Sequence, residues 1–228
     1  EELEDDPIGV GLEFIENFLE FTKQVDLHSP KVKVFNPKQR NGQTSSTTSI
    51  FIIQRDMPFL VDSVRIVLNR CGLNIQTIKS TSLNVTRDEG GALVTAFADE
   101  GDPCSCKEAL IAIGVDFHRA HEKHLVLEQN IIDVLHDVEA VTDDFLPMVH
   151  RLNEAIDEVK ENNGHLPQDE ACELAAFLEW MRDDAYILLG CSEYKLIEGR
   201  TPPKLEHLSE RQLGIFARHP VEVSKTAL

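Results

Sequence analysis

The sequence predicts an α+β fold, and two observations lead to that prediction. From residue 49 to about residue 196, stretches with strand-like and helix-like patterns alternate as strand, helix, strand, strand, helix, strand. That order is the ferredoxin-like one. Hydrophobic residues make up 42% of the 228 residues, which is enough for a core. We therefore expect a ferredoxin-like antiparallel sheet with helices on one face, plus extra helices.

The first predicted elements precede this order. Apolar residues recur at helical spacing between Leu12 and Val25, so residues 1–30 are predicted to be an N-terminal helical segment. The stretch KVKVFNP at 31–37 alternates apolar and basic residues, which predicts a short strand. The polar residues 40–48 predict a loop.

The most informative stretch begins with a β-branched strand at Ser49–Gln54. Pro58 is predicted to be the first residue of the next helix, because the missing proline N–H is not needed there. Gly72 is predicted to end that helix in the left-handed conformation. A helix N-terminus that faces the end of a strand suits a small anionic or zwitterionic ligand. The turn therefore favours a binding or regulatory module over a catalytic centre.

The central part of the sheet follows. A long β-branched strand is predicted at 73–87, and a turn rich in Gly and Asp leads into a second strand at 92–98, so a hairpin is expected. A further strand is predicted at 109–118. Residues 121–161 then keep a helical apolar period, which Pro147 is expected to divide or kink.

The last part of the chain predicts a helix at 169–182 and a strand at 185–196, which would be the final strand of the sheet. We therefore predict an α+β domain over 31–161. Residues 162–228 are predicted to supply a helix plus a strand that completes the sheet or starts the next domain. The tail beyond Glu198 looks incomplete as a fold unit, and the first methionine is Met57, so the chain is expected to be a fragment.

The charge of the chain excludes several partners. Lys and Arg number 22 against 40 Asp and Glu, a formal charge of −18. Such a surface repels nucleic-acid phosphates and anionic lipid, so neither partner is expected. No apolar run reaches the ~20 residues that span a bilayer. The five cysteines are irregularly spaced, which is typical of reduced thiols, so a cytoplasmic protein is expected.

Three motifs together resemble a known family. KVKVFNP, then RDMPFLVDSV with RCGLNI, then FLEWMRDDAYILLGCSEY resemble the N-terminal region of the large bacterial NAD-specific glutamate dehydrogenases, in the correct order across about residues 31–196. That region is similar to an ACT domain, a ferredoxin-like module that binds amino acids or mediates subunit contacts. The resemblance implies that residues 31–161 form an ACT-like domain.

The resemblance also implies a function. The parent enzyme would oxidatively deaminate L-glutamate to 2-oxoglutarate and ammonia with NAD. This segment would be its regulatory and assembly region, with the downstream catalytic region of the same chain, a homo-oligomer and an amino-acid effector as partners. A free-standing ACT-type amino-acid sensor or dimerisation module is the alternative.

No catalytic residue and no cofactor is assigned to the segment itself. A dinucleotide site needs a glycine fingerprint directly after a strand. Gly9-Val10-Gly11 follows no predicted strand, and Gly90-Gly91 lies in a hairpin turn. NAD is therefore implied only for the parent enzyme.

The resemblance places an effector site at the turn. Its candidate residues are Asp56, Met57, Pro58, Phe59 and Asp62, which line either an altered effector site or a packing surface. Ligand-binding ACT domains usually have glycine directly after the turn proline, and this chain has Phe59 there. A large apolar residue beside a helix start is most often buried, so Phe59 is expected to lie in the core.

Two places in the sequence carry residue types that bind metals, but no metal site is predicted at either. His118, His121 and His124 follow Cys104 and Cys106, and imidazole and thiolate are zinc ligands. Helical rotation separates His124 from the other two histidines, however, and Cys-x-Cys is not a typical zinc spacing.

The pair His136-Asp137 also occurs in metal-dependent phosphohydrolases, but here it falls outside the apolar face of its predicted helix, as solvated side chains do. Asp183 and Asp184 precede the last predicted strand. We assign them no chemistry, because neighbouring carboxylates in a loop are usually solvated.

Overall fold

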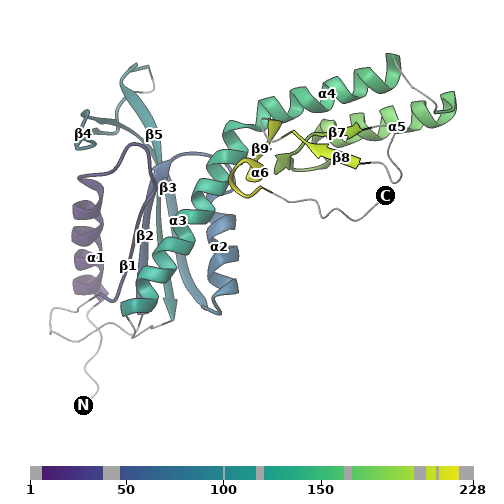
Figure 1. Cartoon of the computed structure of the whole chain (residues 1–228). Helices are drawn as coiled ribbons and strands as arrows, with labels where there is room; N and C mark the ends of the chain where they lie inside the picture. The colour runs from purple at the N-terminus through teal and green to yellow at the C-terminus, as the bar shows by residue number, and fades with distance from the viewer. Residues whose placement is uncertain are drawn as a thin grey trace. The chain divides into compact units, whose positions relative to one another are not determined.

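The computed structural model describes residues 7–37, 47–99, 101–116, 121–161, 166–197, 204–208 and 211–220. The chain divides into two compact units, Glu1–Val138 and Glu139–Leu228. Figure 1 shows a sheet with helices in the first unit and a helical hairpin with short strands in the second. The sequence analysis predicted domain boundaries after residues 30 and 161, and these boundaries stay predictions.

The first unit is built on a five-stranded antiparallel sheet with the order β1-β2-β5-β3-β4. Its strands are β1 Lys31–Phe35, β2 Thr47–Arg55, β3 Ile75–Arg87, β4 Leu93–Ala96 and β5 Ser105–Asp116. The helix α2, Leu60–Arg70, connects β2 to β3, and β5 lies between those two strands. This is the split β-α-β arrangement that the sequence predicted, and the α+β class is confirmed.

The sheet has a core on each face, because alternate residues of a strand point to opposite sides. On one face, Ile50, Ile52 and Ile111 are at most 1% exposed and pack with α2 and with α3, His121–Asp143. On the other face, Phe51 and Ile53 pack with Phe18 and Phe21 of α1, Pro7–Thr22. The predicted N-terminal helix therefore covers part of the face opposite α2 and α3 (Figure 1).

The fourth strand of the ferredoxin-like order is β1, which precedes the other strands in the chain, and not the predicted strand at 185–196. β1 pairs antiparallel with β2 from Lys31↔Ile53 to Phe35↔Ser49, so it takes the edge position that the prediction gave to 185–196. The prediction of one strand over 185–196 was wrong. A π-helical turn covers Met181–Ala185, and two short strands follow, β6 Gly190–Cys191 and β7 Tyr194–Ile197.

The second unit is a helical hairpin with two small antiparallel sheets. Its helices are α4 Phe145–Glu161, α5 Gln168–Trp180 and the short α6 Ile215–Arg218. Strand β6 pairs with β9, Leu213–Gly214, and β7 pairs with β8, Lys204–His207. Met148 and Ile156 of α4, with Ala171 and Ala175 of α5, are at most 4% exposed.

The predicted break at Pro147 lies three residues too late. α3 ends at Asp143 and α4 begins at Phe145, so Pro147 lies in the first turn of α4, where proline costs no intrahelical hydrogen bond. Among the described residues, no helix is both long and apolar enough to cross a membrane.

Candidate functional site

The β2–α2 turn lies at the end of the sheet where β2 stops. α2 begins at Leu60, and Phe59 is its N-cap residue, so the prediction that Pro58 starts the helix was wrong. Phe59 has φ 68°, a left-handed conformation that favours glycine and is strained for a phenylalanine. Its side chain is 48% exposed, so the expectation of a core residue was also wrong.

Asp56 fixes the turn to the neighbouring strand. Its backbone N–H donates to the carbonyl of Lys107 at 2.8 Å, and its Oδ2 lies 3.3 Å from the ammonium of Lys107. Lys107 belongs to β5, so the turn is held against the start of that strand. The Asp56 side chain is 26% exposed and therefore remains accessible from solvent.

Asp62 lies in the first turn of α2, where a carboxylate interacts favourably with the helix dipole. Its side chain is 73% exposed, and Oδ1 lies 3.7 Å from Nη1 of Arg65. Met57 packs against the core below α2. The structure thus brings Asp56, Met57, Pro58 and Phe59 together on one turn and places Asp62 on the helix that follows.

Gln54 is a residue of this region that the sequence analysis missed. It is the buried polar residue that closes the apolar run of β2, and it is 7% exposed. Its Nε2 donates to Sδ of Met57 at 3.7 Å, whereas Oε1 is buried and has no hydrogen-bond partner among the described residues. A buried acceptor without a donor costs about 1–3 kcal/mol. A glutamine directly after the apolar run of residues 50–53 was the signal available in the sequence.

Two kinds of ligand-binding group lie in or next to the β2–α2 turn. The first N–H groups of a helix have no intrahelical acceptor, and no side chain among the described residues caps the N-terminus of α2. Gln54 lies on the same face of β2 as Ile50 and Ile52, the face that α2 covers. The turn thus combines backbone donors, which suit a carboxylate, with a buried acceptor that suits an ammonium group.

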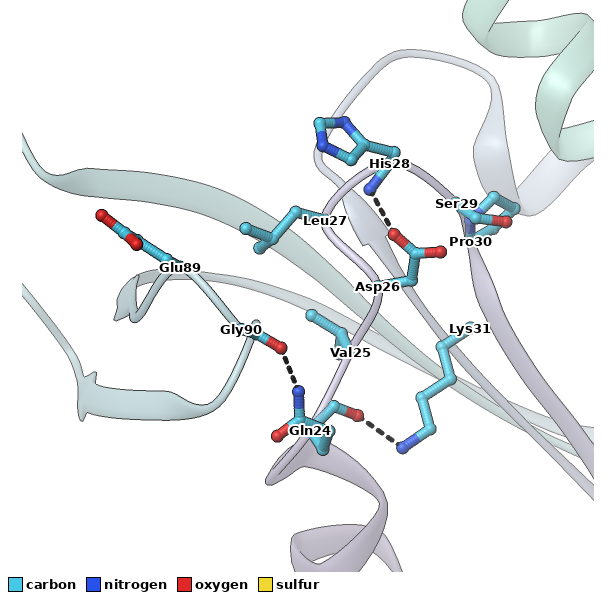
Figure 2. A pocket seen from close by; sticks show the side chains of 10 residues that line it. All are labelled: Gln24, Val25, Asp26, Leu27, His28, Ser29, Pro30, Lys31, Glu89 and Gly90. Atoms are coloured by element: carbon cyan, nitrogen blue, oxygen red, sulfur yellow. Dashed lines mark hydrogen bonds between the residues drawn. The ribbon is translucent and has the colours of Figure 1, made fainter.

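The described cavities lie elsewhere. One of about 570 Å³ lies between the segment Gln24–Lys31 and the turn at Glu89 and Gly90. Figure 2 shows the ammonium of Lys31 directed at the carbonyl of Gln24, at 2.6 Å, and the carboxylate of Asp26 accepting from the N–H of His28.

Lys31 has a structural role in this cavity. Its ammonium also donates to the carbonyl of Phe21 at 2.8 Å, so it satisfies carbonyls at the C-terminal end of α1. Burial, and then the charge of Arg87, lower the pKa of Lys31. The carboxylates of Asp26 and Glu89 carry the remaining formal charge of the lining, so an anionic ligand is disfavoured here.

The candidate metal-binding and acidic residues of the sequence analysis do not form a site among the described residues. His118 lies outside the described residues, and His124 is buried with 6% exposure. Nε2 of His136 lies 3.5 Å from Oγ of Ser29, and Asp183 accepts from the guanidinium of Arg182. Within the described ranges, no three His, Cys, Asp or Glu side chains are grouped so that they could hold a metal ion.

Neither glycine pair fits a dinucleotide. Gly9 and Gly11 lie inside α1, and Gly90 and Gly91 lie in the turn between β3 and β4. Neither pair stands between a strand and the helix that it opens, as a pyrophosphate-binding loop must.

Two cysteines have pKa values that disfavour nucleophilic chemistry. Burial, together with the charge of Glu108, raises the pKa of Cys106. Burial likewise raises the pKa of Cys191. Both thiols therefore stay protonated at neutral pH, and a protonated thiol is a poor nucleophile.

Comparisons with known proteins point to one family. The family model described as "Glutamate dehydrogenase, ACT1 domain" matches residues 1–131. An NAD-specific glutamate dehydrogenase of Halomonas elongata is 35% identical over 199 residues, which are 86% of this chain and 12% of that protein. The enzyme of the same name from Pseudomonas aeruginosa is 30% identical over 85% of this chain and 12% of its own length. The chain thus spans about an eighth of the length of these relatives.

Proposed function

The chain belongs to the family of the glutamate dehydrogenase ACT1 domain, and from this we propose that it is the N-terminal regulatory and assembly region of an NAD-specific glutamate dehydrogenase. The parent enzyme converts L-glutamate, NAD⁺ and water to 2-oxoglutarate, ammonium, NADH and a proton in the cytoplasm, in a catalytic region further along the polypeptide. The present segment contributes regulation and subunit contacts.

The regulatory role rests on the unpaired Oε1 of Gln54, which lies in β2 next to the β2–α2 turn. An amino acid carries both groups that this turn can bind. Its carboxylate accepts from the first N–H groups of α2, and its ammonium donates to Gln54 Oε1. Asp56, Met57, Pro58, Phe59 and Asp62 form the rim of this effector site.

Calorimetric titration of the chain with glutamate, aspartate and arginine tests the effector site. We expect saturable binding of at least one of them, and at least about tenfold weaker binding by the Gln54→Leu and Asp56→Ala variants, because a hydrogen bond to a charged group contributes about 1.5–3 kcal/mol. Gln129→Leu on α3 is the matched control, since Gln129 is exposed and bonds only locally to Asp133. Absence of binding by the wild type would remove the effector role.

The non-catalytic role has a simple test of its own. The chain incubated with glutamate and NAD is expected to form no NADH, because no catalytic group is assigned to it. Formation of NADH at a rate above that of a heat-denatured sample would contradict the proposal.

A role in assembly is favoured by the outer edge of β3. β5 pairs along β3 from Ile75 to Thr86, whereas β4 pairs only with Val85, Thr86 and Arg87. The N–H of Ala98 also donates to the Asn84 carbonyl at 2.8 Å, so within the described part of the chain no strand pairs with the outer side of residues 75–83. An unprotected edge is a template for pairing with another strand.

The composition of this edge favours a second copy as the partner. No Asp or Glu occurs between Leu73 and Arg87, in a chain that contains 40 such residues. Two copies can therefore approach here without the repulsion that the rest of the surface imposes. Sedimentation equilibrium tests this: we expect a dimer that Thr81→Glu dissociates and that Asn69→Glu, a substitution on the exposed side of α2, leaves intact.

A further inference from the structure

A continuous apolar surface is exposed on the second unit. Leu174, Phe177 and Trp180 recur every three residues along α5, and Phe177 and Trp180 are 49% and 53% exposed. The extended segment after the π-helical turn adds Tyr186 and Ile187, which are 52% and 60% exposed. We call these five residues the α5 aromatic surface.

The rings of this surface are packed against one another. The Phe177 and Trp180 rings lie 5.8 Å apart, and Tyr186 meets Trp180 edge to face at 5.2 Å. The π-helical turn Met181–Ala185 brings Tyr186 back onto Trp180, and such turns are frequent at functional sites. The arrangement holds three aromatic side chains in place while half of each remains open to solvent.

The α5 aromatic surface is not the face through which α5 packs inside the second unit. α5 already packs through the opposite face, where Ala171 and Ala175 are 4% exposed. Contiguous exposed apolar patches of this kind mark interaction sites, and Trp and Tyr are the residues that most often dominate binding energy at interfaces.

The charged residues around the α5 aromatic surface indicate what kind of partner it binds. Asp169, Glu170 and Glu173 are exposed on α5, so the apolar centre has an acidic rim. A second copy would bring the same carboxylates against this rim, and a membrane would bring anionic head groups. The partner that fits is an apolar groove with basic residues around it.

We propose that the α5 aromatic surface docks onto such a basic-rimmed groove elsewhere in the parent polypeptide. The relatives are about seven times as long as this chain, so a large part of the parent remains available to cover the surface. This inference rests on the proposed function, because it requires that the chain be part of a longer enzyme.

Photo-crosslinking in the intact parent enzyme tests the docking. Benzoylphenylalanine is placed at position 177 and, as the control, at position 146, where Leu146 is 74% exposed on α4 of the same unit. Mass spectrometry is expected to find cross-links from position 177 to peptides outside these 228 residues, at least fivefold more abundant than those from position 146. Cross-links to the α5 segment of a second copy, cross-links to lipid, or equal yields at the two positions would overturn the proposal.

Thermal unfolding gives an independent readout. Phe177→Ser is expected to leave the Tm of the 228-residue chain unchanged, because Phe177 is half exposed in it, and to lower the Tm of the parent. An unchanged Tm in both proteins would count against docking. Absence of any longer reading frame would instead remove the proposed function itself, so the two failures are distinguishable.

Discussion

Arg87 and Glu108 form a buried bidentate ion pair between the end of β3 and the start of β5. Nη2 of Arg87 donates to Oε2 of Glu108 at 2.8 Å, and the two side chains are 2% and 7% exposed. Nη1 of Arg87 also donates to the carbonyls of Thr22 and Gly91. One guanidinium thus joins the end of α1, the β3–β4 turn and the centre of the sheet.

Removing one partner of this pair is expected to destabilise the first unit strongly. Glu108→Gln should lower the free energy of unfolding by about 3–5 kcal/mol, because it leaves the guanidinium buried without a counter-charge. Urea unfolding followed by circular dichroism measures the change. Asp62→Asn, which breaks an exposed pair with Arg65, is the control and should cost less than about 1 kcal/mol. Equal effects of the two substitutions would contradict a buried, structural pair.

Gly91 is expected to be indispensable for the attachment of α1. It has φ 82°, and a Cβ atom there would lie 2.0 Å from the carbonyl oxygen of Val25, whose N–H in turn donates to the Gly91 carbonyl at 3.1 Å. Gly91→Ala should therefore lower the free energy of unfolding by at least about 2 kcal/mol, through backbone strain and overpacking together. Gly90→Ala is the neighbouring control, because its nearest contact would be 3.4 Å from Asp88. Similar unfolding midpoints for both variants would contradict this geometry.

Phe59→Gly is expected to stabilise the chain relative to Phe59→Ala by about 1 kcal/mol. Both substitutions remove a half-exposed ring, but only glycine relieves the left-handed backbone, which costs other residues about 1–2 kcal/mol. Glycine gives back part of this gain through the greater entropy of the unfolded chain. Denaturant unfolding of the two variants measures this difference in the free energy of unfolding. An alanine variant as stable as the glycine variant would show that the backbone of residue 59 is not strained.

Asp116 is expected to make stability depend on pH at the acidic end. Its carboxylate accepts from the side-chain amides of Asn74 at 2.6 Å and Gln76 at 2.9 Å, and these hydrogen bonds lower its pKa. A lowered pKa in the folded state means that the carboxylate stabilises the fold above the ordinary value of about 3.9. This stabilisation is lost as the pH falls through the folded-state pKa.

An NMR titration of the Asp116 carboxyl carbon measures this pKa directly. We expect a value below about 3.9 in the wild type and a higher one in Asn74→Ala, which removes the hydrogen bond that lowers the pKa of Asp116 most. Identical titration curves for the two proteins would show that the Asn74 amide does not act on the carboxylate.

The strands and helix that follow one another locally were predictable from the sequence. β2 and β3 are rich in β-branched residues, α2 has apolar residues at helical spacing, and Gly72, at φ 71°, follows α2 as predicted. The position of β1 in the sheet was not predictable, because pairing such as Val34↔Ile50 is a long-range choice that local pattern does not encode. The strand predicted over 185–196 was wrong because a run of apolar residues does not show whether it is buried. The apolar side chains from Tyr186 onward are exposed rather than buried in a sheet.

The candidate site was predictable in outline only. The turn itself was located by Pro58 and the strand before it. The left-handed backbone of Phe59 could not be predicted, because a residue with a Cβ atom rarely adopts it. Gln54 could not be identified from the sequence because one polar residue at the end of an apolar run forms no pattern of its own. Its unpaired Oε1 can be recognised only when the neighbouring side chains are in place.

The most direct test of the account is an NMR titration of the isotope-labelled chain with the amino acid that binds in calorimetry. If the β2–α2 turn is the effector site, the largest shifts will be those of the side-chain amide of Gln54 and of the backbone amides of Leu60 and Val61, and Gln54→Leu will abolish them. Shifts confined to the cavity at Gln24–Lys31, or no saturable shift at the turn, would contradict it.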